Sequence, residues 1–107
     1  MNKTSFYDER NDILSIHKGF KNGEKFKTNI DVGSVVLDFS DKGRIVGIEL
    51  MNASDILKKE HFDASNMDFN ADITPKSVLI KLFLKIKGSN DFMPAIIAVP
   101  LEKPLAV

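Results

Sequence analysis

The feature that most restricts the possible folds of this chain is the segment at residues 35–54, VVLDFSDKGRIVGIELMNAS. In it, two apolar runs flank the turn-forming sequence Ser40-Asp41-Lys42-Gly43. Asp41 and Lys42 suit a type I turn, and Gly43 suits the left-handed conformation that closes a three-residue hairpin loop. The segment therefore predicts an antiparallel β-hairpin that leads into a short helix.

The register of this hairpin decides which residues share a face. With Phe39 opposite Ile45, an uninterrupted ladder places Val35 opposite Glu49. Both faces are then rich in apolar groups, so a helix, a second sheet or another subunit must cover each of them. Glu49 is expected on the same face as Leu37 and Phe39, where a carboxylate needs a hydrogen bond or an ion pair.

Length and composition indicate one globular domain over residues 1–107, with 43% hydrophobic residues. Lys and Arg total 15 and Asp and Glu total 15, so no overall field attracts nucleic acid or an anionic membrane. The absence of cysteine excludes disulfides and favours a cytoplasmic location. We expect no signal sequence and no membrane segment, because no apolar run approaches the roughly 18 residues that a membrane helix needs.

Alternation of apolar and polar residues predicts strands on both sides of the central hairpin. The predicted strands are 5–8, 13–17, 26–32, 67–73, 76–87 and 93–101, with a helix from Asn52 or Ser54 to about His61. Pro94 and Pro100 make the last strand an edge strand, because proline cannot donate to a central ladder. The expected fold is mainly β, with α+β as the alternative, and consists of antiparallel meanders with one short helix. They form either two packed sheets or one extended sheet.

Several short motifs between residues 5 and 57 are shared with one family. They are the Tyr7-Asp8 pair, Asp12 before an apolar strand, the Asp-x-x-Gly turn, Gly47-Ile48-Glu49 and Ala53-Ser54. The chain thus resembles the small prokaryotic domain-of-unknown-function family numbered 2283. The resemblance implies a compact β-rich unit without an established activity and, because some members look like partners of small toxin-like proteins, an antitoxin-like binding role. A family-like unit is expected over residues 5–62, and a C-terminal β extension over 63–107.

Tyr7, Asp8 and Glu49 are the candidate ligand-binding residues. For Glu49, the favoured interpretation is a structural hydrogen bond or ion pair, with Tyr7 as one possible donor, and a ligand-facing acid is the alternative. Asp8 lies with Glu9 and Asp12 around the first turn, where side-chain capping is the commoner use of such residues.

No catalytic residue, metal site or cofactor is predicted. The segment 38–49 resembles a calcium loop but has Lys42 where an oxygen ligand is needed, and the segment 68–79 lacks the glycine and the closing glutamate. His17 and His61 are far apart in the sequence, and the common hydrolase and nucleotide motifs are missing.

The sequence favours a non-catalytic protein-interaction or self-assembling module. Because both faces of the central hairpin are apolar and the chain is small, we expect a second copy of the chain, in a homo-oligomer, or another protein to cover one of them. A small-ligand-binding protein or enzyme centred on Glu49, Tyr7 and Asp8 is the alternative. The lysines at 81, 85 and 87 resemble a nucleic-acid platform, but the zero net charge favours a half-solvated sheet face instead.

Overall fold

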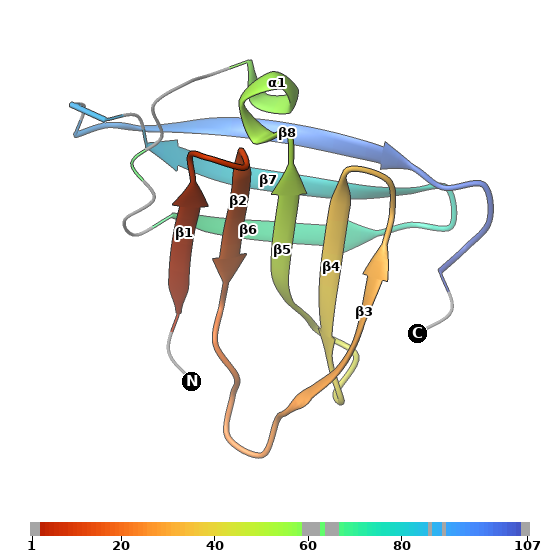
Figure 1. Cartoon of the computed structure of the whole chain (residues 1–107). Coiled ribbons are helices and arrows are strands. Elements are labelled where there is room, and N and C mark those ends of the chain that lie inside the picture. The colour runs from red at the N-terminus through yellow and green to blue at the C-terminus, as the bar shows by residue number, and fades with distance from the viewer. Residues whose placement is uncertain (1–2, 59–62, 64–66, 86, 89, 106–107) are drawn as a thin grey trace.

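In the computed structural model, which describes residues 3–58, 63, 67–85, 87–88 and 90–105, the chain forms two antiparallel sheets. The larger sheet has the strand order β1-β2-β5-β4-β3, and the smaller has the order β6-β7-β8. Figure 1 shows the strands of the smaller sheet running across those of the larger one. The mainly β prediction is confirmed, and the molecule adopts two packed sheets rather than one extended sheet.

The five-stranded sheet combines a hairpin with a three-stranded meander. The hairpin consists of β1 (Thr4–Asp8) and β2 (Ile13–His17), and the meander of β3 (Phe26–Asp31), β4 (Val35–Ser40) and β5 (Ile45–Met51). Because β2 pairs with β5 and not with β3, the loop after β2 takes the chain to the far edge of the sheet. The second sheet is a simple meander of β6 (Asp68–Ile73), β7 (Ser77–Lys85) and β8 (Phe92–Pro100).

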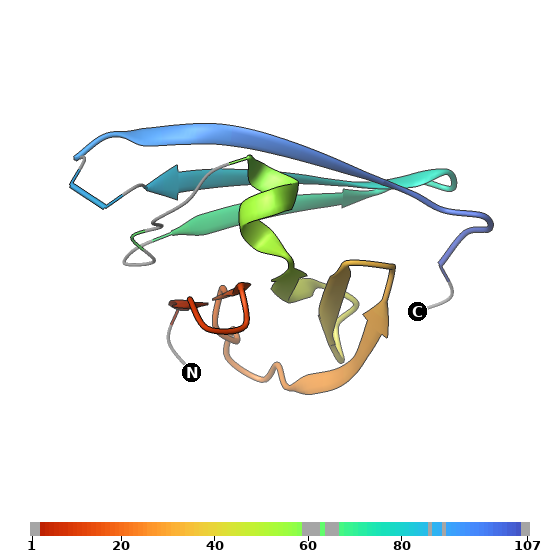
Figure 2. The same cartoon turned by 45° about the horizontal axis from the view of Figure 1, so that its top comes forward.

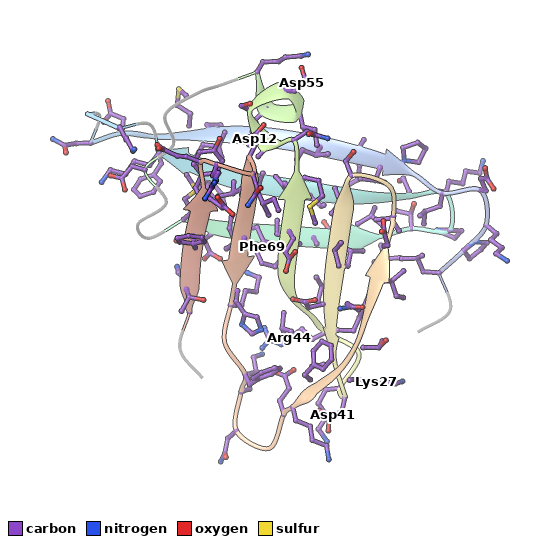
Figure 3. All side chains as sticks on the ribbon, viewed as in Figure 1. Asp12, Lys27, Asp41, Arg44, Asp55 and Phe69 are labelled. Atoms are coloured by element: carbon purple, nitrogen blue, oxygen red, sulfur yellow. The ribbon has the colours of Figure 1, made fainter. Side chains whose placement is uncertain are left out.

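One apolar core lies between the inner faces of the two sheets. Alternate residues of the strands supply it: Leu14, Ile16, Leu37, Phe39, Ile48 and Leu50 from the larger sheet, and Phe69, Val78, Ile80, Leu82 and Leu84 from the smaller. Phe69, labelled in Figure 3, is fully buried. Each large apolar side chain contributes about 1.5–3 kcal/mol when it is fully buried. The C-terminal sheet is therefore the cover that the inner face of the central hairpin requires.

The turn between β4 and β5 forms as predicted. The Ser40 backbone N–H donates to the Arg44 carbonyl at 2.9 Å, and the Gly43 N–H donates to the Ser40 carbonyl at 3.0 Å. Gly43 has φ 77°, in the left-handed region that a residue with a side chain adopts at a cost. The three-residue loop is confirmed.

The predicted register beyond this turn is wrong. Phe39 pairs with Ile45 as expected, but a bulge next to Phe39 shifts the remaining pairs by one residue. Val36, and not Val35, therefore lies opposite Glu49. Because successive side chains of a strand point to opposite faces, this shift moves Glu49 from the core face to the outer face of the sheet.

The helix α1 spans Ala53–Leu57, and its predicted end at about His61 lies outside the described residues. Asn52 precedes it with φ 53° and makes no side-chain capping hydrogen bond. Instead, the Asp12 carboxylate accepts the N–H and the hydroxyl of Ser54 in the first turn of the helix. Lys58 ends the helix in the left-handed conformation. Figure 2 shows α1 rising from the end of β5 toward the three-stranded sheet. The described residues contain no helix that is long and apolar enough to cross a membrane.

The strand β8 is an edge strand, as its prolines predict. Just beyond it, the Leu101 N–H donates to the Lys76 carbonyl at 2.8 Å, so odd-numbered positions of β8 hydrogen-bond toward β7. Pro94 and Pro100 occupy even-numbered positions, whose backbone groups point to the open edge. The N–H that each proline lacks would have pointed to the open edge, so its absence removes no hydrogen bond to β7.

Candidate functional site

Tyr7 belongs to a hydrogen-bonded cluster around Asp12. The Tyr7 hydroxyl donates to Asp12 Oδ1 at 2.6 Å, the Ser54 N–H donates to the same oxygen at 3.0 Å, and the Ser54 hydroxyl donates to Oδ2 at 2.7 Å. The hydrogen bond from Tyr7, followed by that from Ser54, lowers the pKa of Asp12 below its ordinary value. Figure 3 shows Asp12 next to α1. Asp12 thus ties the first turn to the start of the helix, and Tyr7 supports it.

Asp8 caps the turn between β1 and β2. Its Oδ1 accepts the Asn11 backbone N–H at 3.1 Å, and its Oδ2 accepts the Asn11 side-chain amide at 2.8 Å. The side-chain hydrogen bond from Asn11 is the main cause of the lowered pKa of Asp8. The turn-capping interpretation of Asp8 is confirmed.

The structure does not bring the three predicted site residues together. Tyr7 pairs with Leu14 and packs against the core, so it lies on the inner face of the larger sheet. Glu49 pairs with Ser15 on the outer face. Asp8 also points outward, at the end of β1, where both of its carboxylate oxygens accept hydrogen bonds from Asn11 in the turn. Tyr7 and Glu49 therefore make no common pocket.

The outer face of the five-stranded sheet is uncovered by the second sheet and is rich in carboxylates. We call it the acidic face. Its outward paired residues are Thr4, Phe6, Asp8, Ile13, Ser15, His17, Phe26, Asn29, Asp31, Val36, Asp38, Ser40, Gly47, Glu49 and Met51. A hollow of about 160 Å³ opens on it, lined by Phe6, Ser15, His17, Asp38 and Glu49 among others. This volume is below the roughly 300–1,000 Å³ of a typical cofactor or small-molecule pocket.

Gly47 allows two titratable side chains to approach each other in this hollow. A Cβ on Gly47 would lie 2.7 Å from Asp38 Oδ2 and 3.0 Å from His17 Cδ2. Burial lowers the pKa of His17, and its Nδ1 accepts the Gly19 N–H at 2.8 Å, which favours the neutral ring. Burial raises the pKa of Asp38, and His17 opposes that rise. Asp38 forms no hydrogen bond or ion pair with another described residue.

An ion pair between Glu24 and Arg44 was missed by the sequence interpretation. Arg44 donates to both Glu24 carboxylate oxygens at 2.6 and 3.0 Å, and the Ser40 hydroxyl donates to Glu24 at 2.7 Å. Arg44 also donates to the Gly19 carbonyl at 3.0 Å, so the pair fastens the loop after β2 to the central hairpin. Hydrogen bonding from Arg44 lowers the pKa of Glu24 to about 2. No local sequence pattern identifies partners that are twenty residues apart.

The outer face of the three-stranded sheet is the second uncovered surface, and we call it the apolar face. Its outward residues are Asp68, Asn70 and Asp72 from β6, Ser77, Leu79, Lys81, Phe83 and Lys85 from β7, and Phe92, Pro94, Ile96, Ala98 and Pro100 from β8. All the outward residues of β8 are apolar. Ile96 is 73% exposed, Phe92 47% and Leu79 40%.

The three lysines that resemble a nucleic-acid platform, Lys81 and Lys85 on the apolar face and Lys87 just beyond β7, are partly engaged within the chain. Lys81 Nζ lies 5.5 Å from the centre of the Phe83 ring, and Lys85 forms an ion pair with Asp63 at 3.4 Å. Lys87 binds Glu9 at 2.6 Å. Two of the three lysines therefore already have a carboxylate partner, which weakens the likeness to a nucleic-acid platform.

The two calcium-like segments lie in strands. Residues 38–49 form most of the β4–β5 hairpin, and residues 68–72 lie in β6. Within the part of the chain that the structure describes, no group of three or more His, Asp or Glu side chains is arranged to hold a metal ion.

Comparison with known proteins identifies a family over the first half of the chain. Residues 5–54 match the model of a family described as a protein of unknown function, DUF2283. An uncharacterized protein of Methanocaldococcus jannaschii is 37% identical over 57 residues, which cover 53% of this chain and 47% of that protein. The chain thus matches about half the length of this relative, and no solved structure matches it. The matched segment contains most of β1, all of β2 to β5 and the start of α1, whereas β6 to β8 lie outside it. Residues 5–54 of this chain therefore resemble the DUF2283 family.

Proposed function

We propose that this chain is a non-catalytic protein-interaction module that associates with a second copy of itself through the apolar face. The supporting observation is the exposure of Ile96, Phe92 and Leu79 on one side of one sheet. Contiguous exposed apolar surface is a common mark of a protein–protein interface, because its burial removes apolar area from water.

Association through the face is favoured over association through the open edge of β8. Pro94 and Pro100 remove two N–H groups from that edge, so a strand of another copy finds an incomplete set of donors there. Ile96 and Ala98, which lie between these prolines, in contrast project from the face without charge. Packing of two such faces needs no backbone hydrogen bonds between copies.

The charges on the apolar face suit a two-fold contact. Asp72 on β6 and Lys81 on β7 both lie on this face next to Leu79: Asp72 is the cross-strand partner of Leu79, and Lys81 is two residues further along β7. A two-fold axis brings the same patch of both copies together, so Lys81 of each copy is able to approach Asp72 of the other. The centre of the contact is then formed by the apolar side chains of β8, and Lys81 and Asp72 pair between the two copies at its rim.

Two other functions have less support. An antitoxin-like role is a narrower form of the same proposal, in which a different protein takes the place of the second copy; it rests on the family resemblance. A small-ligand site or an active site formed by Tyr7, Asp8 and Glu49 has less support because Tyr7 and Glu49 lie on opposite faces of the sheet.

Sedimentation velocity from low to high micromolar concentration tests the proposal with Ile96→Lys and a matched control, Phe26→Lys. Phe26 is 51% exposed on β3, so the control adds the same charge to exposed apolar surface elsewhere. We expect a wild-type dimer that buries at least about 1,000 Å² in total. Ile96→Lys should weaken it by about 2 kcal/mol or more, roughly 30-fold in dissociation constant.

The control should remain dimeric, and all three proteins should have similar melting temperatures, because both side chains are exposed in the monomer. A wild-type protein that stays monomeric at high micromolar concentration contradicts the proposal. A dimer that Ile96→Lys leaves intact, or that both variants weaken equally, places the contact on another surface.

A further inference from the structure

The acidic face belongs to the segment that matches the family model, residues 5–54, and the second sheet does not cover it. The inner face of the five-stranded sheet is covered by β6 to β8, which supply about a third of the buried core residues. Figure 2 shows the second sheet on one side of the five-stranded sheet, and none of the described strands and helix lies on the other side. The outer face is therefore the broad surface of the matched segment that the second sheet leaves accessible to a partner.

This face carries a net negative charge. Its outward strand positions include Asp8, Asp31, Asp38 and Glu49, whereas two basic residues, Lys27 at the bulge of β3 and Arg44 paired with Glu24, lie near the turn between β4 and β5. The chain as a whole has a formal net charge of zero, so the negative charge is a property of this face. An acidic surface attracts a basic partner and repels nucleic acid and anionic membranes.

The two carboxylates at the centre of the face are available to a partner. Asp38 and Glu49 form no hydrogen bond or ion pair with any other described residue. His17 does not neutralise them, because its Nδ1 accepts the Gly19 N–H and burial lowers its pKa. An incoming cation would stabilise the charged form of Asp38 and so oppose the effect of burial, which raises its pKa.

Apolar groups lie beside these carboxylates. Phe6 is 65% exposed and shares a cross-strand row with Ser15, Glu49 and Val36. The hollow of about 160 Å³ lies between the Phe6 ring and Asp38. A lysine or arginine side chain suits this arrangement, since its apolar stem packs on an aromatic ring while its charged end reaches a carboxylate.

We propose that the acidic face docks a basic segment of another protein, with one arginine or lysine side chain in the hollow between Phe6, Asp38 and Glu49. This contact is separate from self-association, which uses the opposite side of the molecule. The partner is defined by its chemistry: positive side chains that alternate with apolar ones along an extended segment.

An NMR titration of the ¹⁵N-labelled full chain tests this with a synthetic peptide in which arginine alternates with valine. The site variant is Asp38→Asn with Glu49→Gln, which removes two charges and keeps the side-chain shapes. The control variant is Asp55→Asn with Glu102→Gln, which removes the same charge from exposed positions outside the acidic face. A glutamate–valine peptide and free arginine methyl ester serve as further probes.

The expected result is a shift of amide signals on β1, β2, β4 and β5, and a dissociation constant that rises at least about tenfold in the site variant and less than about twofold in the control. Binding should weaken with added salt. The proposal is overturned if the arginine–valine peptide does not bind, if both variants lose equal affinity, or if the shifts map to β7 and β8. Equal binding of arginine methyl ester would show a site for free cations, and binding of the glutamate–valine peptide would exclude charge recognition.

Discussion

Removal of the Asp12 carboxylate should be among the most damaging single changes outside the core. Asp12 accepts three hydrogen bonds, one from Tyr7 and two from Ser54. At about 1 kcal/mol of net stability for each bond, their loss costs about 3 kcal/mol. Asp12 also has φ 55°, so an alanine in its place adds about 1 kcal/mol of backbone strain. Asp12→Ala should therefore lower the free energy of unfolding by about 4 kcal/mol, a large part of the 5–15 kcal/mol of a typical domain.

Urea denaturation followed by circular dichroism measures this change. Asp12→Asn tolerates the positive φ and keeps one acceptor oxygen, so it should cost about half as much as alanine. Tyr7→Phe should cost about 1 kcal/mol in the wild-type background and less when Asp12 is already alanine, because its hydroxyl has then lost this acceptor. A cost below about 1 kcal/mol for Asp12→Ala, or an equal cost of Tyr7→Phe in both backgrounds, would refute the argument that Asp12 organises this corner of the fold.

Two further predictions concern the central hairpin. Gly43→Val should lower the free energy of unfolding by about 1 kcal/mol or more, whereas Gly43→Asn should cost less, because asparagine tolerates the left-handed region and nothing lies within 4 Å of the added Cβ. Equal denaturation midpoints for both variants would contradict the role of the turn. The pKa of Glu24 is lowered from 4.5 to about 2, so the stability that its pair with Arg44 contributes is present above pH 4.5 and is lost as the pH falls to about 2. Melting temperatures between pH 6 and pH 2 should fall less steeply for Glu24→Gln than for the wild type; parallel curves would argue against this linkage.

Several parts of the fold were determined locally, by residues close together in the sequence. The turn closed by Gly43 and the capping of the first turn by Asp8 each depend on neighbours within a few positions. The edge position of β8 follows from Pro94 and Pro100, since proline has no N–H in any fold. Strand existence was likewise predictable from alternation, and all eight strands lie close to their expected ranges.

Other parts of the fold depend on contacts between distant residues. The pairing of β2 with β5, the capping of α1 by Asp12 and the pair of Glu24 with Arg44 each join residues far apart in the chain. No local pattern encodes these pairings, because several strands of similar length and polarity compete for the same neighbour. The same holds for the choice of two packed sheets over one extended sheet, which was settled by burial of the inner faces against each other.

The face on which Glu49 lies shows most clearly what only the tertiary structure decided. Alternation fixes the face of a strand residue when one side is apolar and the other polar. Around the bulge, Ile45 and Val46 are both buried and both apolar, so the sequence contains no signal for the extra residue. The sequence determined that a hairpin would form at this turn; the packing of the second sheet on one side decided which residues face the core and left Asp38 and Glu49 on the open side.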